Sequence, residues 1–448
     1  MEHRKVKYGR TWWKRQRKKN QTPSRPKSCD NDQDMIVLRQ WMHKDGYTGC
    51  SLKPAVFPDT GRGLMTTRNI SPGNILISIP EALLITTDTV LDSDLGQMIA
   101  NSKMKLKPIQ VLVLFLVVER YKGSASQWQH YVDVLPKEYT TPLYFNHDEI
   151  NSLNDPIKHQ ATELIDNVAE LFKSTQYSIK HLDYKIGTVS LDDILTYDIF
   201  KWAWCAVNTR SVYIDHINSD WLDTTTEKNH FALAPYLDLI NHTNSAKVEA
   251  GFNFENRCYD IKTLDTYKKY DQVFICYNQH SNVKLFLEYG FILPDNDCSI
   301  VSVTPSDIYT ICKKLSHLGN IKEKLKFLNQ KELLVNLEVS LNGASWNLKT
   351  CVLILSANTE KNEYSFMKCV YDSSDSCYTT CKMLMKTLLE NKIESAGNHD
   401  SCRKGFESSE APLPYKAVII DTLNGERERI LRSNIKMLLT NKEYFLRD

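Results

Sequence analysis

The sequence lacks the short motifs that mark the commonest catalytic and cofactor sites. It contains no G-x-x-x-x-G-K-[ST] phosphate loop, no H-E-x-x-H zinc pair, no G-x-S-x-G nucleophile turn and no G-x-G-x-x-G dinucleotide fingerprint. Nothing in the chain therefore indicates a P-loop enzyme, a zinc protease, a serine hydrolase or a dehydrogenase.

Paired cysteines and long apolar runs are missing as well. The twelve cysteines include no C-x-x-C pair, so neither a zinc ribbon nor a disulfide framework is indicated, and we expect no metal. Reduced thiols suit a nuclear or cytoplasmic protein. The longest apolar run, residues 111–118, has eight residues, which is too short to cross a bilayer. The chain begins with basic residues and no apolar segment, so we expect neither a signal peptide nor a membrane anchor.

The net charge of +2 hides a strong asymmetry. Residues 1–27 hold eleven Lys or Arg and one Glu, which gives +10 and leaves −8 for the rest of the 448 residues. The stretch has no periodic apolar face, so we expect residues 1–33 to form a disordered basic arm. Such an arm is a nuclear import signal, a nucleic-acid contact or simply a solvated tail.

The remaining chain is long enough for two or three domains and reads as a mixture of helices and short strands. Residues 34–46 have helical spacing, residues 74–80 read as a strand, and residues 97–122 read as buried helix. Residues 257–264 and 272–277 alternate around a polar turn, which predicts a hairpin. Beyond residue 300 the pattern is mainly helical.

Four weak signals for a functional site follow one another along the chain. They are the turn of Gly61, Arg62 and Gly63, the segment "DLINH" with Asp238, Asn241 and His242, the strand end at Tyr277, and "EYGF" with Tyr289. Each has an ordinary structural explanation alone: two glycines make a turn, Asn-His suits a turn, and a strand-end tyrosine is usually half-buried.

Their order, in "FPDTGRGLM", "LAPYLDLINH" and "FICYNQHSNVKLFLEYGF", resembles the SET-domain protein methyltransferases, in particular the split-SET group of the Rubisco large-subunit methyltransferase type. The resemblance implies an α+β protein with a β-rich SET fold at residues 34–295. A helical insert of about 121–225 would interrupt it, and a helical C-terminal substrate-binding-like domain would follow at 300–448.

The resemblance also implies residue roles, with S-adenosylmethionine as cofactor. Cofactor-binding residues would be Gly61, Arg62, Gly63, Arg210, Asp238, Asn241, His242 and Tyr277, and the active-site tyrosines Tyr277 and Tyr289. Thr60 and Arg62 depart from the residues usual in this group, so contacts at the turn are expected to run through the backbone. The implied activity is protein-lysine methylation by a monomer, with histones among the candidate substrates.

The chemistry is consistent with these residue types. A lysine must lose its proton before it can attack a methyl group, and with a pKa of ~10.4 only about one in 2,500 is neutral at pH 7. A dry channel lined by tyrosines favours the neutral amine, because burial penalises the ammonium. Two alternatives stay open: a protein-histidine methyltransferase, and a catalytically silent binding module with the SET shape.

Overall fold

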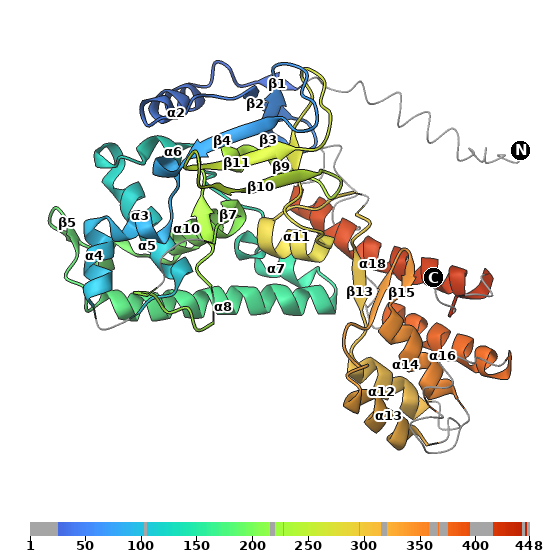
Figure 1. Ribbon diagram of the computed structural model, residues 1–448. Coiled ribbons are helices and arrows are strands. Elements are labelled where there is room, and N and C mark those ends of the chain that lie inside the picture. Colours follow the sequence, from blue (N-terminus) through green and yellow to red (C-terminus); the bar gives the residue numbers. More distant parts are fainter. Residues whose placement is uncertain are drawn as a thin grey trace, which may run out of the picture. The chain divides into compact units, whose positions relative to one another are not determined.

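The structure, a computed structural model, describes residues 26–102, 105–215, 220–226, 228–294, 296–314, 320–357, 366, 375–394, 415–440 and 444–445. The chain divides into two compact units, Met1–Lys137 with Phe172–Tyr277 and Glu138–Leu171 with Asn278–Asp448 (Figure 1). Residues 1–25 of the expected basic arm lie outside the described residues.

The end of the expected arm is part of the fold, so the boundary at residue 33 was placed too late. Lys27–Ser28 forms strand β1, which pairs antiparallel with β2, Leu52–Phe57. Asp32 then caps helix α2, Gln33–Lys44, by accepting hydrogen bonds from the backbone N–H groups of Asp34 and Met35.

The first unit combines short sheets with helices. Its sheets have the strand orders β1-β2-β3, β10-β11-β4, β7-β8, β12-β9 and β5-β6. The remaining bounds of these strands are β3 Gly61–Thr66, β4 Ile75–Pro80, β7 Ser211–Tyr213, β8 Phe231–Leu233, β9 Asn241–His242, β10 Val248–Asn253, β11 Cys258–Thr263 and β12 Phe274–Ile275. Figure 1 shows β2, β3, β4, β10 and β11 gathered on one side of this unit.

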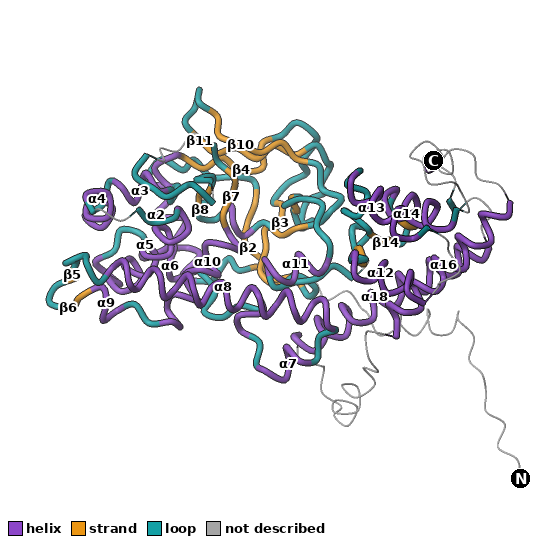
Figure 2. Tube along the Cα trace, turned by 90° about the horizontal axis from the view of Figure 1, so that it is seen from below, coloured by secondary structure: helices purple, strands orange, loops and turns teal. Residues whose placement is uncertain are grey.

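Two helices form the apolar centre of the first unit. Helix α5, Pro108–Lys122, is buried on nearly every side from Ile109 to Glu119, because residues 111–118 are all apolar. The buried Gln110 donates to Thr175, and the buried Glu119 accepts from Ser126. It lies beside α10, Tyr197–Arg210 (Figure 2), and the guanidinium of Arg120 stacks 4.1 Å above the ring of Trp202.

Smaller helical and strand elements complete the first unit. They are η1 Glu81–Leu83, α3 Thr87–Leu91, α4 Asp94–Asn101, η2 Gly123–Ala125, α6 Gln129–Val134, β5 Lys185–Ile186, β6 Val189–Ser190, α9 Leu191–Ile194 and η4 Leu237–Leu239. Helix α8, Asp155–Ile179, begins in the second unit and ends in the first.

The hairpin predicted between residues 257–264 and 272–277 was wrong. Strand β11 pairs with β10 and β4, whereas β12 is two residues long and pairs in parallel with β9. Residues 271–273 run along β3, where the N–H of Val273 donates to the carbonyl of Leu64. Alternation shows that a segment is extended but not which neighbour it pairs with, so the sequence could not distinguish these partners.

The second unit is mainly helical and also contains a sheet that the sequence did not indicate. Strands β13, β14 and β15 form this three-stranded sheet. The elements are η3 Pro142–Tyr144, α7 His147–Asn151, α11 Asn282–Tyr289, β13 Ile300–Ser302, α12 Pro305–Lys314, α13 Ile321–Gln330, β14 Glu338–Ser340, β15 Gly343–Ala344, α14 Trp346–Ser356, α16 Asp375–Glu394 and α18 Tyr415–Thr440.

The compact units divide the chain differently from the expected domains. Residues 138–171, expected within the insert, and residues 278–295, expected within the SET domain, belong to the unit that contains the C-terminal helices. An apolar cluster explains this grouping, because Phe145, Phe286 and Ile419 are buried together in it.

Candidate cofactor and active site

The Gly61–Gly63 turn opens β3 and lies directly against Asn241. Gly61 has a φ of +70°, in the left-handed region that favours glycine. A Cβ on Gly63 would lie 2.7 Å from Nδ2 of Asn241 and 2.9 Å from Nε2 of Gln272. Its absence lets Nδ2 of Asn241 donate to the carbonyl of Arg62 at 3.2 Å. The structure thus brings together the turn and the asparagine, which are far apart in the sequence.

The segment that leads to Asn241 begins at a residue with an uncommon backbone conformation. Tyr236 has a φ of +69°, uncommon for a bulky side chain, and leads into the short helix η4. Its hydroxyl donates to the carbonyl of Leu52 at 3.2 Å, and burial raises its pKa. Strand β2 therefore fixes Tyr236, the residue at which the segment leading to the Asn-His pair begins.

His242 is buried, and its side chain serves the local structure. Its Nδ1 accepts the backbone N–H of Tyr277 at 3.0 Å, so the ring proton is on Nε2, which lies 3.0 Å from Oδ1 of Asn244. The His242 and Tyr277 rings pack with centroids 4.9 Å apart. Because the imidazole is held in this way, we expect His242 to contact the cofactor through its backbone atoms.

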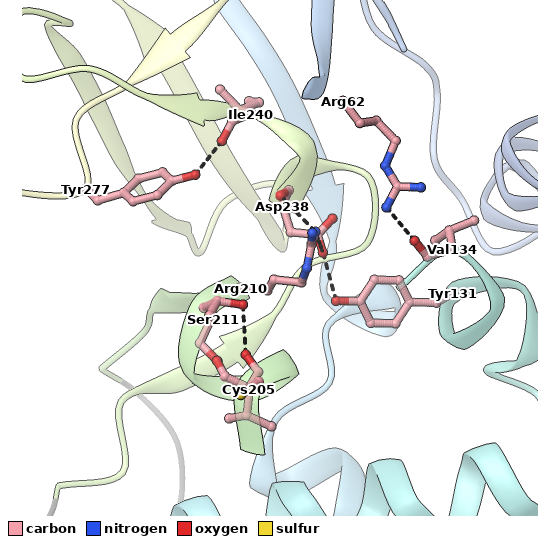
Figure 3. A network of polar contacts seen from close by, with 11 residues as sticks. Arg62, Tyr131, Val134, Cys205, Arg210, Ser211, Asp238, Ile240 and Tyr277 are labelled. Carbon is pink, nitrogen blue, oxygen red and sulfur yellow. Dashed lines mark hydrogen bonds and ion pairs between the residues drawn. The ribbon is translucent and has the colours of Figure 1, made fainter. Parts of the chain in front are cut away.

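Arg210 and Asp238 form a buried ion pair beside this segment (Figure 3). Nη1 of Arg210 lies 3.0 Å from Oδ2 of Asp238 and 3.2 Å from its backbone carbonyl, and the aspartate side chain is 2% exposed. The same Oδ2 accepts the hydroxyl of Tyr131 at 3.0 Å. Asp238 therefore holds Arg210 in place and fixes the backbone of η4, which is a supporting role.

Arg62 adds a second cation near the same carboxylate. Its Nη2 donates to the carbonyl of Val134 at 2.5 Å, as Figure 3 shows. Burial and then the neighbouring Arg210 lower the pKa of Arg62, while Asp238 acts in the opposite direction. Asp32 acts in the same direction as Asp238, so the two guanidiniums are matched by two carboxylates.

Tyr277 follows β12 and is not part of an alternating strand, contrary to the sequence reading. Its hydroxyl donates to the carbonyl of Ile240 at 2.8 Å, one residue before Asn241 (Figure 3). Because its backbone N–H is also bound to His242, the half-buried tyrosine is held at both ends. The structure thus places Tyr277 with the Asn-His pair.

Tyr289 is the last residue of α11 in the second unit, and Gly290 ends that helix in the left-handed conformation. Burial, with Glu288 in the same direction, raises the pKa of Tyr289 to about 12. Its ring stacks on His280 with centroids 6.1 Å apart. Burial, and then Lys284, lower the pKa of His280 and so favour the neutral form of the imidazole next to Tyr289.

Sequence reasoning missed two contributors to the site. Tyr131 binds Asp238 from 107 positions away, and Gln272 joins the turn through Nε2, which donates to Thr60 Oγ1 at 2.7 Å. No local motif surrounds either residue, so pairing across space was the missing information.

The residues at the turn and the Asn-His pair fit S-adenosylmethionine. Arg210 provides a guanidinium for a carboxylate, Arg62 contributes its backbone to the turn, and the Asn241 amide can both donate and accept. No heavy atom from elsewhere in the described chain lies within 4 Å of the position that a Cβ on Gly61 would take, so the turn is open there to a ligand, whereas the space beside Gly63 is taken by Asn241 and Gln272. Among the described residues, no group of three or more His, Cys, Asp or Glu side chains is arranged to hold a metal ion, and no helix is both long and apolar enough to span a bilayer.

The SET-domain family model matches residues 61–278, which include the turn, the ion pair, the Asn-His pair and Tyr277. The chain belongs to the SET-domain family of S-adenosylmethionine-dependent methyltransferases. It is 33% identical to mouse SET domain-containing protein 4 over 434 residues, covering 96% of this chain and 97% of that protein. It is 36% identical to the human protein of that name over 354 residues, covering 79% of each chain.

The chain is also similar to an enzyme named for its action on histidine and to a solved structure. The actin-histidine N-methyltransferase of Danio rerio is 32% identical over 247 residues, covering 54% of this chain and 39% of that enzyme. The SET domain of LSMT bound to MeLysine and AdoHcy superposes with a TM-score of 0.64 at 17% identity, covering 92% of this chain and 93% of the other. The predicted SET fold is therefore confirmed.

Proposed function

We propose that this chain is a protein-lysine N-methyltransferase and that Tyr277 and Tyr289 are its active-site tyrosines. The observation that carries the proposal is the Tyr277 hydroxyl, held at 2.8 Å on the Ile240 carbonyl beside Asn241. Support for lysine comes from the solved structures of similar fold, in which LSMT is bound to lysine or methyllysine.

Each residue has a distinct task in this account. The bound cofactor supplies a methyl group on a positively charged sulfur. Asn241, the backbone of the Gly61–Gly63 turn and the side chain of Arg210 would hold the amino-acid end of the cofactor. Tyr277 presents an oxygen whose position is fixed by its hydrogen bond, and fixed polar groups favour one orientation of an incoming amine. Burial of that amine favours its neutral form.

Histidine is the second candidate substrate, because the chain also resembles actin-histidine N-methyltransferases. Neutral imidazole is abundant at pH 7, so a histidine needs less help in losing its proton. The similarity covers 54% of this chain with the Danio rerio enzyme, against 96% with mouse SET domain-containing protein 4.

The oligomeric state, the substrates and the location of the enzyme are also proposals. We propose a monomer that acts on lysine-bearing protein segments in the nucleus and the cytoplasm, with histones among the candidate substrates and a role in chromatin regulation. The +10 charge of residues 1–27 supports an import signal or a nucleic-acid contact.

Product analysis tests the proposal. The full chain is incubated with methyl-labelled S-adenosylmethionine and cell extract, and the labelled protein is hydrolysed to amino acids, with the Asn241→Ala variant in parallel. We expect label in methyllysine that depends on the intact protein. Label in methylhistidine would replace lysine by the second candidate, and no transfer beyond that of the variant would favour a silent binding module.

A further inference from the structure

Helix α6, Gln129–Val134, contacts both halves of the cofactor site, although no motif marks it. Tyr131 binds the η4 half through Asp238, and the last carbonyl of the helix, that of Val134, binds the turn half through Arg62 (Figure 3). We propose that α6 is a clamp that holds the Gly61–Gly63 turn and the Asn-His segment in register for the cofactor. The inference deepens the proposed function and rests on its cofactor site.

The first attachment runs through Tyr131. This side chain is 0% exposed, so its hydroxyl has a fixed direction, and it donates to Oδ2 of Asp238 at 3.0 Å. Asp238 lies in η4, three residues before Asn241, and also holds Arg210. A buried hydrogen bond to a carboxylate is among the stronger polar contacts, so this attachment restrains the start of the Asn-His segment.

The second attachment runs through Arg62. The last carbonyls of a helix have no partner within the helix and carry partial negative charge, so a guanidinium is a suitable donor to Val134. The backbone carbonyl of Arg62 meanwhile accepts Nδ2 of Asn241. Both attachments therefore lead to Asn241, one through Arg62 and one through Asp238.

Helix α6 is itself anchored at its N-terminal end. Trp128, the residue before α6, is buried against two aromatic rings in edge-on contact. The ring centroids are 5.6 Å away for Trp41 of α2 and 6.5 Å away for Phe115 of α5. Movement of α6 would disrupt these contacts, so both attachments start from a fixed base.

Affinity for S-adenosylhomocysteine, measured by calorimetry without substrate, tests the clamp. Tyr131→Phe keeps the ring and removes the hydroxyl, and Arg62→Met removes the donor to Val134. We expect each to raise the dissociation constant about 5- to 10-fold, the effect of one hydrogen bond, with partial rescue by Arg62→Lys. The double variant should fall short of the product of the single effects, because both act through one helix.

Two control variants remove comparable groups elsewhere. Tyr444→Phe removes a buried hydroxyl that donates to Asn434 at 2.7 Å in the second unit, and Arg68→Gln removes a guanidinium that donates to Ser51. Both should bind the ligand like the unaltered chain.

Backbone hydrogen exchange, measured without ligand, is a second test of the clamp. Tyr131→Phe and Arg62→Met should speed exchange at residues 237–242 and leave β10 and β11 unchanged. Unchanged affinity and exchange in both single variants would overturn the clamp, as would a double variant equal to the product. If Tyr131→Phe does not fold, Arg62→Met, at a half-buried position, decides. An unaltered chain that binds no ligand would overturn the cofactor site, and the clamp with it.

Discussion

Replacement of Tyr277 by Phe separates a catalytic hydroxyl from a structural one. The variant keeps the ring against His242 and loses the hydrogen bond to Ile240, measured at 2.8 Å. One such bond contributes about 1 kcal/mol, which corresponds to a Tm lower by roughly 2–4 °C for a unit of this size. If the oxygen also positions the incoming amine, turnover should fall by about 10²-fold, or roughly 2.7 kcal/mol in the barrier.

The assay compares kcat and cofactor KM with the same labelled cofactor and substrate. Tyr267→Phe is the matched control, because its hydroxyl also donates to a backbone carbonyl of the first unit, that of Phe274, at 3.3 Å. We expect the control to lose stability and keep its turnover. Near-normal turnover of Tyr277→Phe, with activity abolished in Tyr289→Phe, would refute the assignment of Tyr277.

Three further predictions follow from other parts of the chain. Gly63→Ala should weaken cofactor binding at least 10-fold, because its Cβ would meet Asn241 at 2.7 Å, and calorimetry would show it; wild-type affinity would exclude the close approach. Burial alone would raise the pKa of Asp307, but hydrogen bonds from Lys392 and Thr304 lower it overall. Relative to Asp307→Asn, the wild type should lose stability in denaturant titrations as pH falls below about 4, and parallel pH profiles would contradict this. Deleting residues 1–25 preserves β1 and should spare activity on a peptide while reducing nuclear accumulation or salt-sensitive nucleic-acid binding; unchanged behaviour would make the arm a plain tail.

The fold class could be predicted because the order of segments is itself distinctive. The turn, "DLINH" and "FICY" occur in the order that resembles the SET family. The helix at 33–44 has apolar residues at helical spacing and a capping aspartate. Strand pairing could not be predicted, because β12 has two residues and its neighbour β9 also has two. Such short strands leave no periodic signal.

The candidate site was predictable as a set of residues and not as a network. Arg210 and Asp238 were both expected to touch the cofactor, but nothing in the sequence shows that they form an ion pair with each other. Tyr131 and Gln272 were not identified, because their partners are reached only in the folded chain. Local patterns indicate which chemistry is available, whereas packing decides which groups meet.

The most direct test of the central claim is an equilibrium titration of the full chain with S-adenosylmethionine beside its Asn241→Ala variant. The account predicts one cofactor per chain for the unaltered protein and about 10- to 100-fold weaker binding for the variant, the effect of one hydrogen bond to a charged group. Asn253→Ala, which removes an amide that donates to Asp260 at 3.2 Å in the same unit, should titrate like the unaltered chain. Identical curves for the unaltered chain and Asn241→Ala, or no binding by either, would contradict the account.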